Sequence, residues 1–400
     1  MITVAEAEAR ILEGAGPSVR ERVPLAAAAG RVLAEDAAAR RTHPPHDVSA
    51  MDGYAVRHAD IAALPATLPV GFAVAAGAMP PRALKPGEAA RIFTGAVVPE
   101  GADTIVIQED TRAEPGAVTI LEAPAAGRNV RKAGYDFAAG AMLLPAGTRL
   151  AGPALGLLAA ARVDEVSVWR RPRVALLATG DELVPPGRDP KGAEIVASTG
   201  VALAALLDGW GAEAVDLGIA RDDAAEIRAK AEAGLSADVL LTQGGASVGD
   251  HDLIQPALEP LGLTVGFWKI AMRPGKPLMS GRIGGTRVIG LPGNPVSALV
   301  CAMLFVQPLV RALSGEPWRG QRLIEARLGA PLKANDGRQD YLRAVVELSP
   351  DGPVATAMPV QDSGNLSAFA QAGGLIVRPP LAPAAAAGEV VKVLPLAPWL

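Results

Sequence analysis

The chain has 400 residues, of which 50% are hydrophobic, so it is long enough for about two to four domains with sizeable cores. Its net charge of −4 gives no electrostatic reason to expect a nucleic-acid partner. The single cysteine, Cys301, excludes a disulfide within the chain and favours a reducing, intracellular setting.

The sequence contains no membrane or secretion signal. Charge appears already at Glu6, and no apolar segment of the signal-peptide type follows it. The longest apolar stretch, Val296–Val306, is too short to span a bilayer, and we expect Gln307 and Pro308 to end it. We therefore predict a cytoplasmic protein with no membrane partner.

The first 170 residues are predicted to form a small helical segment and a β-domain. Residues 1–40 have a helical pattern, in which Val4, Ala7 and Ile11 recur at helical spacing until glycines end the run. Residues 41–130 alternate short apolar segments with Pro/Gly turns, which is typical of a small β-domain. Its predicted strands are Leu68–Val74, Ala89–Thr94, Thr104–Gln108 and Ala117–Leu121. Residues 131–170 add a Gly-rich loop, a helix over 153–161 and a strand over 165–169.

After a boundary at Arg170-Arg171-Pro172, strands and helices alternate. This order predicts an α/β domain with a doubly wound parallel sheet. The predicted strands are Val174–Thr179, Glu213–Ile219, Asp238–Gln243, Thr264–Ile270 and Arg287–Leu291. The predicted helices are Val201–Asp208, Asp222–Glu232, Leu253–Leu261 and Val296–Leu313. From residue 321 short strands return, which indicates a terminal β-barrel or sandwich; they are Arg322–Leu328, Tyr341–Leu348, Val354–Pro359, Gly373–Arg378 and Glu389–Leu394.

Two glycine-bearing loops connect strands to helices in the α/β segment. In Pro292-Gly293-Asn294-Pro295, Asn294 can cap the following helix, and Pro295 suits its first position. The helix N-terminus would then face an anion such as phosphate. The second loop, 240–250, contains Gly244, Gly245 and Ser247. Each loop alone is equally compatible with an ordinary structural turn.

Acidic residues recur in turns, many of them flanked by glycine, and predict a magnesium site. Such carboxylates hold Mg²⁺ while substrate phosphates complete its coordination. A plain turn at Asp52 and helix capping by Asp181 or Asp222 remain alternatives. The candidates are Asp52, Asp136, Asp181, Glu182, Asp222, Asp223, Asp250 and Asp252.

Three cations surround a Pro-Gly turn at the end of a predicted strand. Lys269, Arg273 and Lys276 suit phosphate or an oxyanion, and arginine binds two oxygens at once. A solvated charged loop is the alternative. Cys/His spacing for zinc, a Gly-x-Ser-x-Gly elbow and a Walker loop are all absent from the sequence.

Six motifs taken together resemble the molybdopterin molybdenumtransferase family of MoeA type, also known as the gephyrin E domain. The match spans nearly the whole chain, and the motifs occur in the family's order. They are Ser-Ala-Met-Asp-Gly-Tyr-Ala at 49–55, Ile-Phe-Thr-Gly-Ala-Val-Val-Pro at 92–99, Thr-Gly-Asp-Glu-Leu at 179–183, Gly-Gly-Ala-Ser-Val-Gly at 244–249, Arg-Pro-Gly-Lys-Pro at 273–277 and Leu-Pro-Gly-Asn-Pro-Val-Ser at 291–297.

The resemblance implies four domains and a homodimer. The expected domains are residues 1–40 with 131–170, the inserted β-domain 41–130, the molybdopterin-binding α/β domain 171–320 and the C-terminal β-barrel 321–400. Members of the family have their active site between the α/β domain of one subunit and the inserted domain of the other. The implied partners are a second copy of the chain, a molybdopterin adenylyltransferase and molybdoenzyme maturation proteins.

The resemblance also implies a Mg²⁺-dependent reaction. Adenylylated molybdopterin is hydrolysed at its pyrophosphate, AMP leaves, and molybdate is ligated to the dithiolene to give molybdenum cofactor. Asp252, with Asp222 or Glu182, would hold Mg²⁺. Asp52 and Asp136 would act across the dimer interface on water or molybdate. Substrate contacts are expected from Thr94, Gly244, Gly245, Ser247, Lys269, Arg273, Lys276, Pro292, Gly293, Asn294, Pro295, Arg343 and Ser363.

Two positions depart from the family pattern. Arg273 stands where lysine is frequent, which keeps the charge and changes its geometry. Gln243 stands where a small residue or threonine is expected, which affects how its loop approaches phosphate. Two other functions remain open: a molybdopterin-binding scaffold or carrier without turnover, and a different nucleotide-using enzyme on the same α/β domain.

Overall fold

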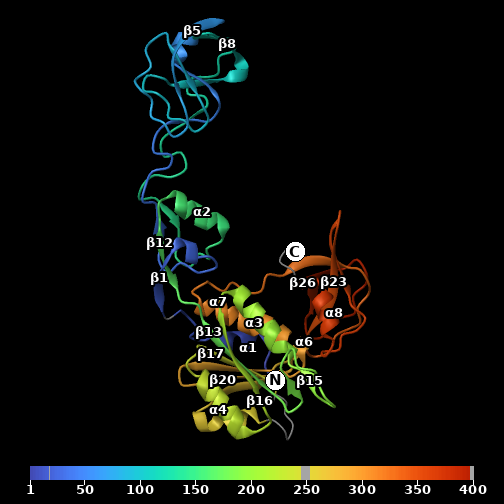
Figure 1. Cartoon of the computed structure of the whole chain (residues 1–400). Helices are drawn as coiled ribbons and strands as arrows, with labels where there is room; N and C mark the ends of the chain where they lie inside the picture. The colour runs from blue at the N-terminus through green and yellow to red at the C-terminus, as the bar shows by residue number, and fades with distance from the viewer. Residues whose placement is uncertain (18, 245–252, 397–400) are drawn as a thin grey trace. The chain divides into compact units, whose positions relative to one another are not determined.

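The computed structural model describes residues 1–17, 19–244 and 253–396. The chain divides into two units, coloured by residue number in Figure 1. The first unit contains Met1–Glu21, Gly30–Ala34 and Val168–Leu400, and the second contains Arg22–Ala29 and Glu35–Ser167. The predicted Gly245, Ser247 and Asp252 lie outside the described residues. The four domain boundaries stay a prediction.

The second unit is built on a six-stranded sheet in the order β7-β4-β6-β5-β9-β8. Its strands are β4 (Gly53–Val56), β5 (Ala66–Val74), β6 (Ala89–Ile92), β7 (Thr104–Ile107), β8 (Thr111–Glu114) and β9 (Ala117–Ile120). The four predicted strands are confirmed, whereas β4 and β8 were not predicted. All four residues of β4 are buried, so it lacks the polar alternation that reveals a strand. A Cβ at Gly53 would lie 1.9 Å from the Val106 carbonyl oxygen, so this close pairing requires glycine.

The other elements that precede the α/β segment are short. The helical pattern at the N-terminus is confirmed for α1 (Val4–Leu12), but the rest of residues 1–40 is mainly loop and short strand. Ladders β3–β10 and β2–β11 are antiparallel. The remaining bounds are β1 (Arg20–Pro24), η1 (Leu25–Ala27), β2 (Ala37–Ala38), β3 (Val48–Ser49), η2 (His58–Ile61), η3 (Gln108–Asp110), β10 (Val130–Arg131), β11 (Met142–Leu144), α2 (Gly152–Ala160) and β12 (Glu165–Trp169).

A six-stranded sheet forms the centre of the first unit, in the order β16-β13-β17-β21-β20-β18. Neighbouring strands from β16 to β21 are parallel, and β20 is antiparallel to both β21 and β18. The doubly wound fold is thus confirmed, with the unpredicted β20 inserted at one side. The strands are β13 (Arg173–Thr179), β16 (Glu213–Ala220), β17 (Val239–Gln243), β18 (Thr264–Lys269), β20 (Pro277–Ile283) and β21 (Thr286–Leu291).

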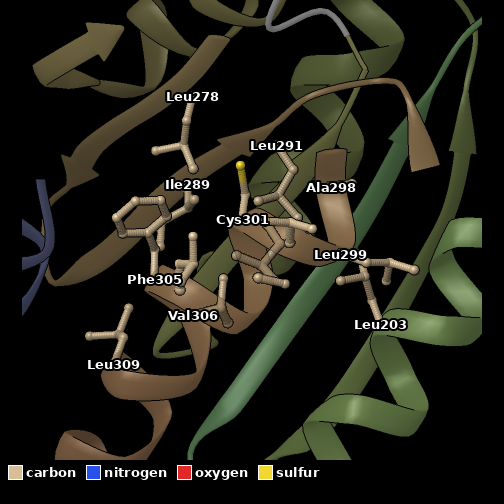
Figure 2. Close-up of a cluster of buried hydrophobic side chains, with 14 of the residues drawn as sticks. Leu203, Leu278, Ile289, Leu291, Ala298, Leu299, Cys301, Phe305, Val306 and Leu309 are labelled. Carbon is tan, nitrogen blue, oxygen red and sulfur yellow. The ribbon is translucent and has the colours of Figure 1, made fainter. Parts of the chain in front are cut away.

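Alternate residues of these strands enter cores on opposite faces of the sheet. Val174 and Leu176 pack with α3 (Ser198–Trp210), α1 and the helix that begins at Pro295. Figure 2 shows this core around Leu291, Cys301 and Phe305. Ala175 and Leu177 instead pack with α4 (Ala224–Gly234) and α5 (Ile254–Leu258), which η4 (Glu259–Leu261) follows. The pleat of the strand therefore sends neighbouring residues into different cores.

The helical run Pro295–Leu313 confirms the predicted helix Val296–Leu313. It consists of α6 (Pro295–Cys301), a π-helical segment (Ala302–Val306) and α7 (Gln307–Leu313). Pro308 falls in the first turn of α7, where its missing N–H is tolerated. In the described ranges this is the one helix long and apolar enough to cross a membrane by length and composition. Its apolar window is 72% buried inside the protein, and core helices meet the same criterion.

The C-terminal segment forms the predicted barrel. Strands β23-β24-β22-β26-β25 pair in that order, and a further β23–β25 pairing closes the ring. Strand β19 (Met272–Arg273), which precedes β20, pairs with β23 and so joins the barrel to the α/β segment. The bounds are β22 (Ile324–Leu328), β23 (Gln339–Ser349), β24 (Gly352–Ala357), α8 (Leu366–Gln371), β25 (Gly374–Arg378) and β26 (Val390–Pro395), with β14 (Leu183–Val184) and β15 (Ile195–Val196) as a separate ladder.

Candidate functional site

A cavity of about 920 Å³, here called the main cavity, lies at the carboxyl ends of β13, β17 and β21. This edge of a parallel sheet is where ligands bind in doubly wound folds. The loops after these strands form one wall, and residues of the barrel form another. Ten predicted site residues line it: Glu182, Asp222, Gly244, Arg273, Lys276, Pro292, Gly293, Asn294, Pro295 and Ser363.

Two carboxylates open into the main cavity. Asp223, not Asp222, caps α4 by accepting the Glu226 N–H at 2.8 Å. The Asp222 N–H in turn donates to Asp181 at 3.2 Å, which fixes the backbone there. Among the described residues, no hydrogen bond or ion pair involves the carboxylate of Glu182 or Asp222.

These carboxylates suit Mg²⁺, which takes one or two protein carboxylates and completes its coordination with water and substrate oxygens. The part of the chain that the structure describes has no group of three or more His, Cys, Asp or Glu residues arranged to hold a metal. A site of this kind therefore depends on oxygens from outside the described side chains.

The Asn294 side chain does not cap α6 as we expected. Its amide nitrogen donates to the Ser363 hydroxyl oxygen at 2.9 Å, and the Val296 N–H donates to the Ser363 carbonyl oxygen at 3.1 Å. Pro295 has no N–H, and the Val296 N–H is already bound to Ser363, so the first turn of α6 offers few free donors to an anion. The barrel residue Ser363 thereby holds the Pro292–Pro295 loop in the cavity wall. Gln243 adds a weak contact, 3.5 Å from its amide nitrogen to the Gly293 carbonyl oxygen.

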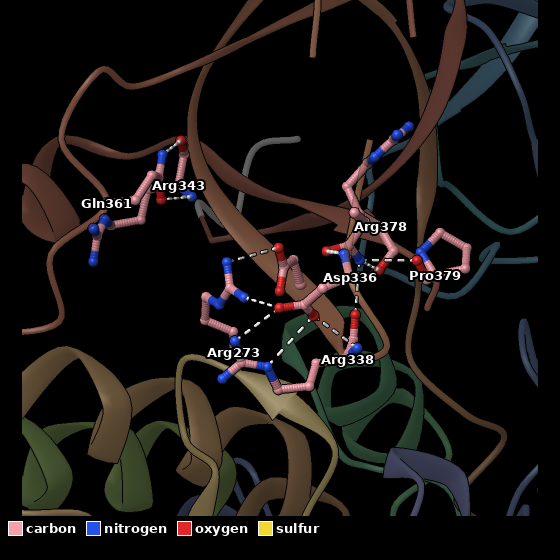
Figure 3. Close-up of polar contacts among 9 residues, drawn as sticks. Arg273, Asp336, Arg338, Arg343, Gln361, Arg378 and Pro379 are labelled. Atoms are coloured by element: carbon pink, nitrogen blue, oxygen red, sulfur yellow. Dashed lines mark hydrogen bonds and ion pairs between the residues drawn. The ribbon is translucent and has the colours of Figure 1, made fainter. Parts of the chain in front are cut away.

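The three predicted cations have different surroundings. Lys276 is exposed, lines the main cavity and has no ion pair within the described ranges. Arg273 instead pairs with two barrel carboxylates, Asp336 and, at 3.7 Å, Asp340. Arg338 also reaches Asp336, at 2.9 Å, and Figure 3 shows both arginines directed toward that carboxylate. Lys269 is half-buried and does not line the cavity.

Arg343 is buried behind the cavity wall, with 1% of its surface exposed. Its backbone exchanges two hydrogen bonds with the Gln361 side chain, at 3.0 and 2.9 Å (Figure 3). Its guanidinium donates to the Val360 carbonyl oxygen at 3.1 Å. Burial lowers the pKa of Arg343, and its Nε has no partner among the described residues. The side chain therefore supports the loop that carries Ser363.

The predicted site residues of the second unit form one clear pair. Asp52 Oδ1 accepts the Thr94 N–H at 2.7 Å and the Thr94 hydroxyl at 2.8 Å. These bonds, the backbone one first, lower the pKa of Asp52. Asp136 is exposed, and its N–H donates to the His43 carbonyl oxygen at 3.1 Å. The Asp52 carboxylate is thus held by Thr94, whereas for Asp136 the backbone is held and, among the described residues, its carboxylate is not.

Three family models match the chain. They are the MoeA N-terminal region (domain I and II) at residues 2–161, a probable molybdopterin binding domain at 175–312 and the MoeA C-terminal region (domain IV) at 325–396. A molybdopterin molybdenumtransferase of Nostoc is 40% identical over 94% of this chain and 88% of its own length. The Haemophilus influenzae protein of that name is 36% identical over 99% and 98%.

The chain belongs to the molybdopterin molybdenumtransferase family. Two solved MoeA structures from Pyrococcus horikoshii agree with this: one has 34% identity, a TM-score of 0.81 and full coverage of both chains. The other has 26% identity, a TM-score of 0.83 and covers 98% of this chain and 99% of its own. The predicted family, fold class and role as a transferase of molybdenum cofactor biosynthesis are confirmed.

Several lining residues of this family member were not predicted. Ser198 and Thr199 start α3, Ser297 lies in the first turn of α6, and Arg338 and Asp362 come from the barrel. A hydroxyl at a helix start is a common sequence feature and carries little signal. Arg338 and Asp362 lie far from the α/β motifs in sequence, so only the tertiary fold reveals them. Asp362 adds a third carboxylate to the cavity lining, and its Oδ1 accepts the Gly364 N–H at 2.8 Å.

Proposed function

We propose that the protein inserts molybdate into adenylylated molybdopterin in a Mg²⁺-dependent reaction that releases AMP. One observation carries this proposal: the carboxylates of Glu182 and Asp222 share a cavity with Lys276, a cation that has no ion pair within the described residues. The substrate pyrophosphate and molybdate are both anions. A site for them needs carboxylates for a metal and a cation for the anions, next to each other.

Glu182 and Asp222 would hold Mg²⁺, together with Asp252, which lies outside the described residues. The bound metal would supply positive charge that neutralises the pyrophosphate oxygens. Lys276 would bind a phosphate or molybdate oxygen as a point charge. The Pro292–Pro295 loop, with Gly244 and Ser363, would position the substrate through neutral contacts. Water adds to phosphorus, the pyrophosphate P–O bond breaks, and AMP leaves with the bridging oxygen or with the water oxygen.

We infer that the working form is a cytoplasmic homodimer in which the second unit of one subunit completes the main cavity of the other. Asp52, Thr94 and Asp136 would then act on water or molybdate in the partner's site. Support comes from the family resemblance, and the hydrogen bonds from Thr94 hold Asp52 in its ionised form for such a role. An adenylyltransferase must supply the substrate, and molybdoenzyme maturation proteins would receive the product. Light scattering tests the dimer, and an active monomer would contradict it.

The deciding experiment measures AMP release from adenylylated molybdopterin by the purified protein, with and without Mg²⁺ and molybdate. We expect release that requires both ions. Glu182→Gln should lower the rate by about 100-fold or more, since a metal-binding charge is lost. Glu194→Gln is a matched control, because Glu194 lies in the next loop, between β14 and β15, pairs with Arg188 and does not line the main cavity.

The alternative function gives a different result. A carrier or scaffold protein would bind molybdopterin tightly without releasing AMP, and Glu182→Gln would leave that binding unchanged. Equal rates for the Glu182 and Glu194 variants would show that the carboxylates of the main cavity take no part in the reaction. Release without molybdate would restrict the reaction to pyrophosphate hydrolysis.

A further inference from the structure

A second cavity of about 570 Å³ adjoins the main one and is here called the side cavity. It lies on the α3 face of the sheet, near the ends of β13, β16 and β17. The two cavities share Ala197 and Gln243 in their linings. The two cavities are therefore neighbours, and a molecule that occupied both would pass Ala197 and Gln243. Its volume falls within the range of small-molecule sites, roughly 300–1,000 Å³.

Small residues on both walls create the side cavity. On the helix wall, Gly200 and Ala204 are four residues apart and so share one face of α3. On the sheet wall, Ala178, Ala214 and Gly218 line the same space. Larger side chains at these positions would fill the gap between α3 and the sheet. The result is a slot with mostly apolar walls, which suits a flat ring system.

One carboxylate stands in this lining. Asp216 lies on β16, where the pairing shifts from Leu176↔Asp216 to Ala178↔Ile219, so β16 has one extra residue. Asp216 Oδ1 accepts the Gly218 N–H at 2.8 Å, and Gly218 has a φ of +75° that favours glycine. Bulges of this kind redirect side chains and are frequent beside active sites. Within the described residues Asp216 Oδ2 has no partner, and it remains available to a ligand.

We propose that the side cavity binds the pterin ring of the substrate, an inference that rests on the proposed function. The substrate carries two flat heterocycles, pterin and adenine, on either side of its pyrophosphate. The pterin edge presents an amino group and a ring N–H as parallel donors, which match a carboxylate. Adenine presents one donor beside one acceptor, and a carboxylate accepts only. Asp216 therefore selects the pterin, with the adenylate left at the Pro292–Pro295 side of the main cavity.

The test measures binding of molybdopterin and of AMP separately, by anaerobic equilibrium ultrafiltration. Asp216→Asn keeps the acceptor for Gly218 and removes the charge, while Ala204→Leu fills the slot. We expect each variant to bind molybdopterin about tenfold more weakly or worse, with AMP affinity changed by less than about twofold. The controls are Glu213→Gln on the same strand and Ala205→Leu on the exposed side of α3, and both should bind molybdopterin as the wild type does. Thermal denaturation checks that each variant is folded.

Two outcomes would overturn the inference: unchanged molybdopterin affinity in both variants, or a loss of AMP affinity in place of molybdopterin affinity. Failure of the pterin site and failure of the proposed reaction give different results. A protein that releases AMP normally, with unaltered binding in both variants, keeps the function and loses the pterin site. A protein that loses molybdopterin binding in these variants but never releases AMP keeps the pterin site and loses the function.

Discussion

The Asn294 side chain donates to the Ser363 hydroxyl oxygen at 2.9 Å, and this bond connects the phosphate-type loop of the α/β segment to the barrel. The neighbouring Val296 N–H donates to the Ser363 carbonyl oxygen at 3.1 Å. The position of the loop that opens α6 therefore depends on a residue from the C-terminal barrel, 69 positions later in the chain.

The Asn294–Ser363 bond predicts a measurable coupling. Asn294→Ala and Ser363→Ala should each lower the free energy of unfolding, and the double variant should lose less than their sum. The coupling should be about 0.5–1 kcal/mol, because the bond is solvent-exposed. Urea denaturation of the four proteins gives the value. Strict additivity would show that the two side chains do not interact in solution.

Neighbouring aspartates at the start of α4 should have separate roles. Asp223→Ala removes the helix cap and should lower the free energy of unfolding by about 1 kcal/mol with little effect on AMP release. Asp222→Ala removes a cavity carboxylate and should abolish most AMP release with little change in stability. Denaturation and AMP assays on both variants test this division. The opposite pattern would exchange the roles of the two residues.

Gly275 should tolerate alanine poorly because Cys301 lies beneath it. Gly275 has a φ of +105°, and an added Cβ would lie 2.4 Å from Cys301 Sγ. Gly275→Ala should lower the free energy of unfolding by about 2–5 kcal/mol, from left-handed strain plus overpacking. It should also move Arg273 and Lys276, which share this loop, and so slow AMP release.

A cycle with Cys301→Ala separates the two contributions. In that background Gly275→Ala should cost about 1–3 kcal/mol less, because the clash with Cys301 Sγ is relieved, while backbone strain and the 3.2 Å approach to Met272 Cε remain. Gly187→Ala provides a control with strain alone, since Gly187 has a φ of +89° and open space around it. An equal cost of Gly275→Ala in both backgrounds would mean that Cys301 does not constrain the loop.

The Asp336 cluster predicts a stability change at acid pH. The Arg338 side chain first, then its backbone N–H and nearby Arg273, lower the pKa of Asp336 to about 2 from an ordinary 3.8. A carboxylate with a lowered pKa stabilises the fold fully above pH about 4 and loses that contribution as pH falls through about 2. Asp340 behaves oppositely, because burial raises its pKa. Between pH about 6 and about 8 the stabilising contribution of Asp336 should be constant.

The urea midpoint measured between pH about 2 and about 5 tests this prediction, for wild type and for Asp336→Asn. The wild type should be more stable than the variant at the upper end, and the difference should shrink toward the lower end. Asp351→Asn, in the turn between β23 and β24, is the control and should parallel the wild type. A difference that grew at lower pH would reverse the sign of the Asp336 contribution.

Sequence patterns predicted the strands that have continuous apolar runs and missed those that depend on pairing. β13 and β17 have such runs and were found almost to the residue. β20 begins with Pro277 and contains Gly281, which obscures its pattern, although Gly284-Gly285 before β21 is a hairpin signal that could have revealed it. The helix predicted over Val296–Leu313 is confirmed, although no sequence pattern indicates the π-helical segment before Pro308.

The main cavity was predictable to the extent that its residues follow strands of one sheet. Glu182 and Asp222 were expected at this edge, and both line the cavity. The sequence does not specify which of the neighbouring residues Asp222 and Asp223 caps α4. The structure shows that it is Asp223, which accepts the Glu226 N–H. The pairing of Arg273 with Asp336 joins residues 63 positions apart, and no local pattern indicates it. Arg338 and Asp362, which the barrel contributes to the cavity wall, were missed for the same reason.

The last prediction concerns the Asp52–Thr94 pair of the second unit and the pKa of the Asp52 carboxyl group. Thr94→Val removes the hydroxyl donor and leaves the backbone donor, so the pKa of Asp52 should rise toward its ordinary value without reaching it. Thr94→Ser keeps both donors and should leave the pKa of Asp52 as in the wild type. Carbon-detected NMR titration of the Asp52 carboxyl group measures the pKa.

The activity of these variants then decides what the hydroxyl contributes. Asp52 stays ionised at neutral pH in every case, because its pKa is lowered from 3.8 in the wild type and Thr94→Val can only return it toward that value. A loss of AMP release in Thr94→Val that Thr94→Ser restores would therefore come from the orientation of the carboxylate, or from a contact of the hydroxyl with substrate. Unchanged release in Thr94→Val would leave the backbone N–H of residue 94 as the sufficient partner of Asp52.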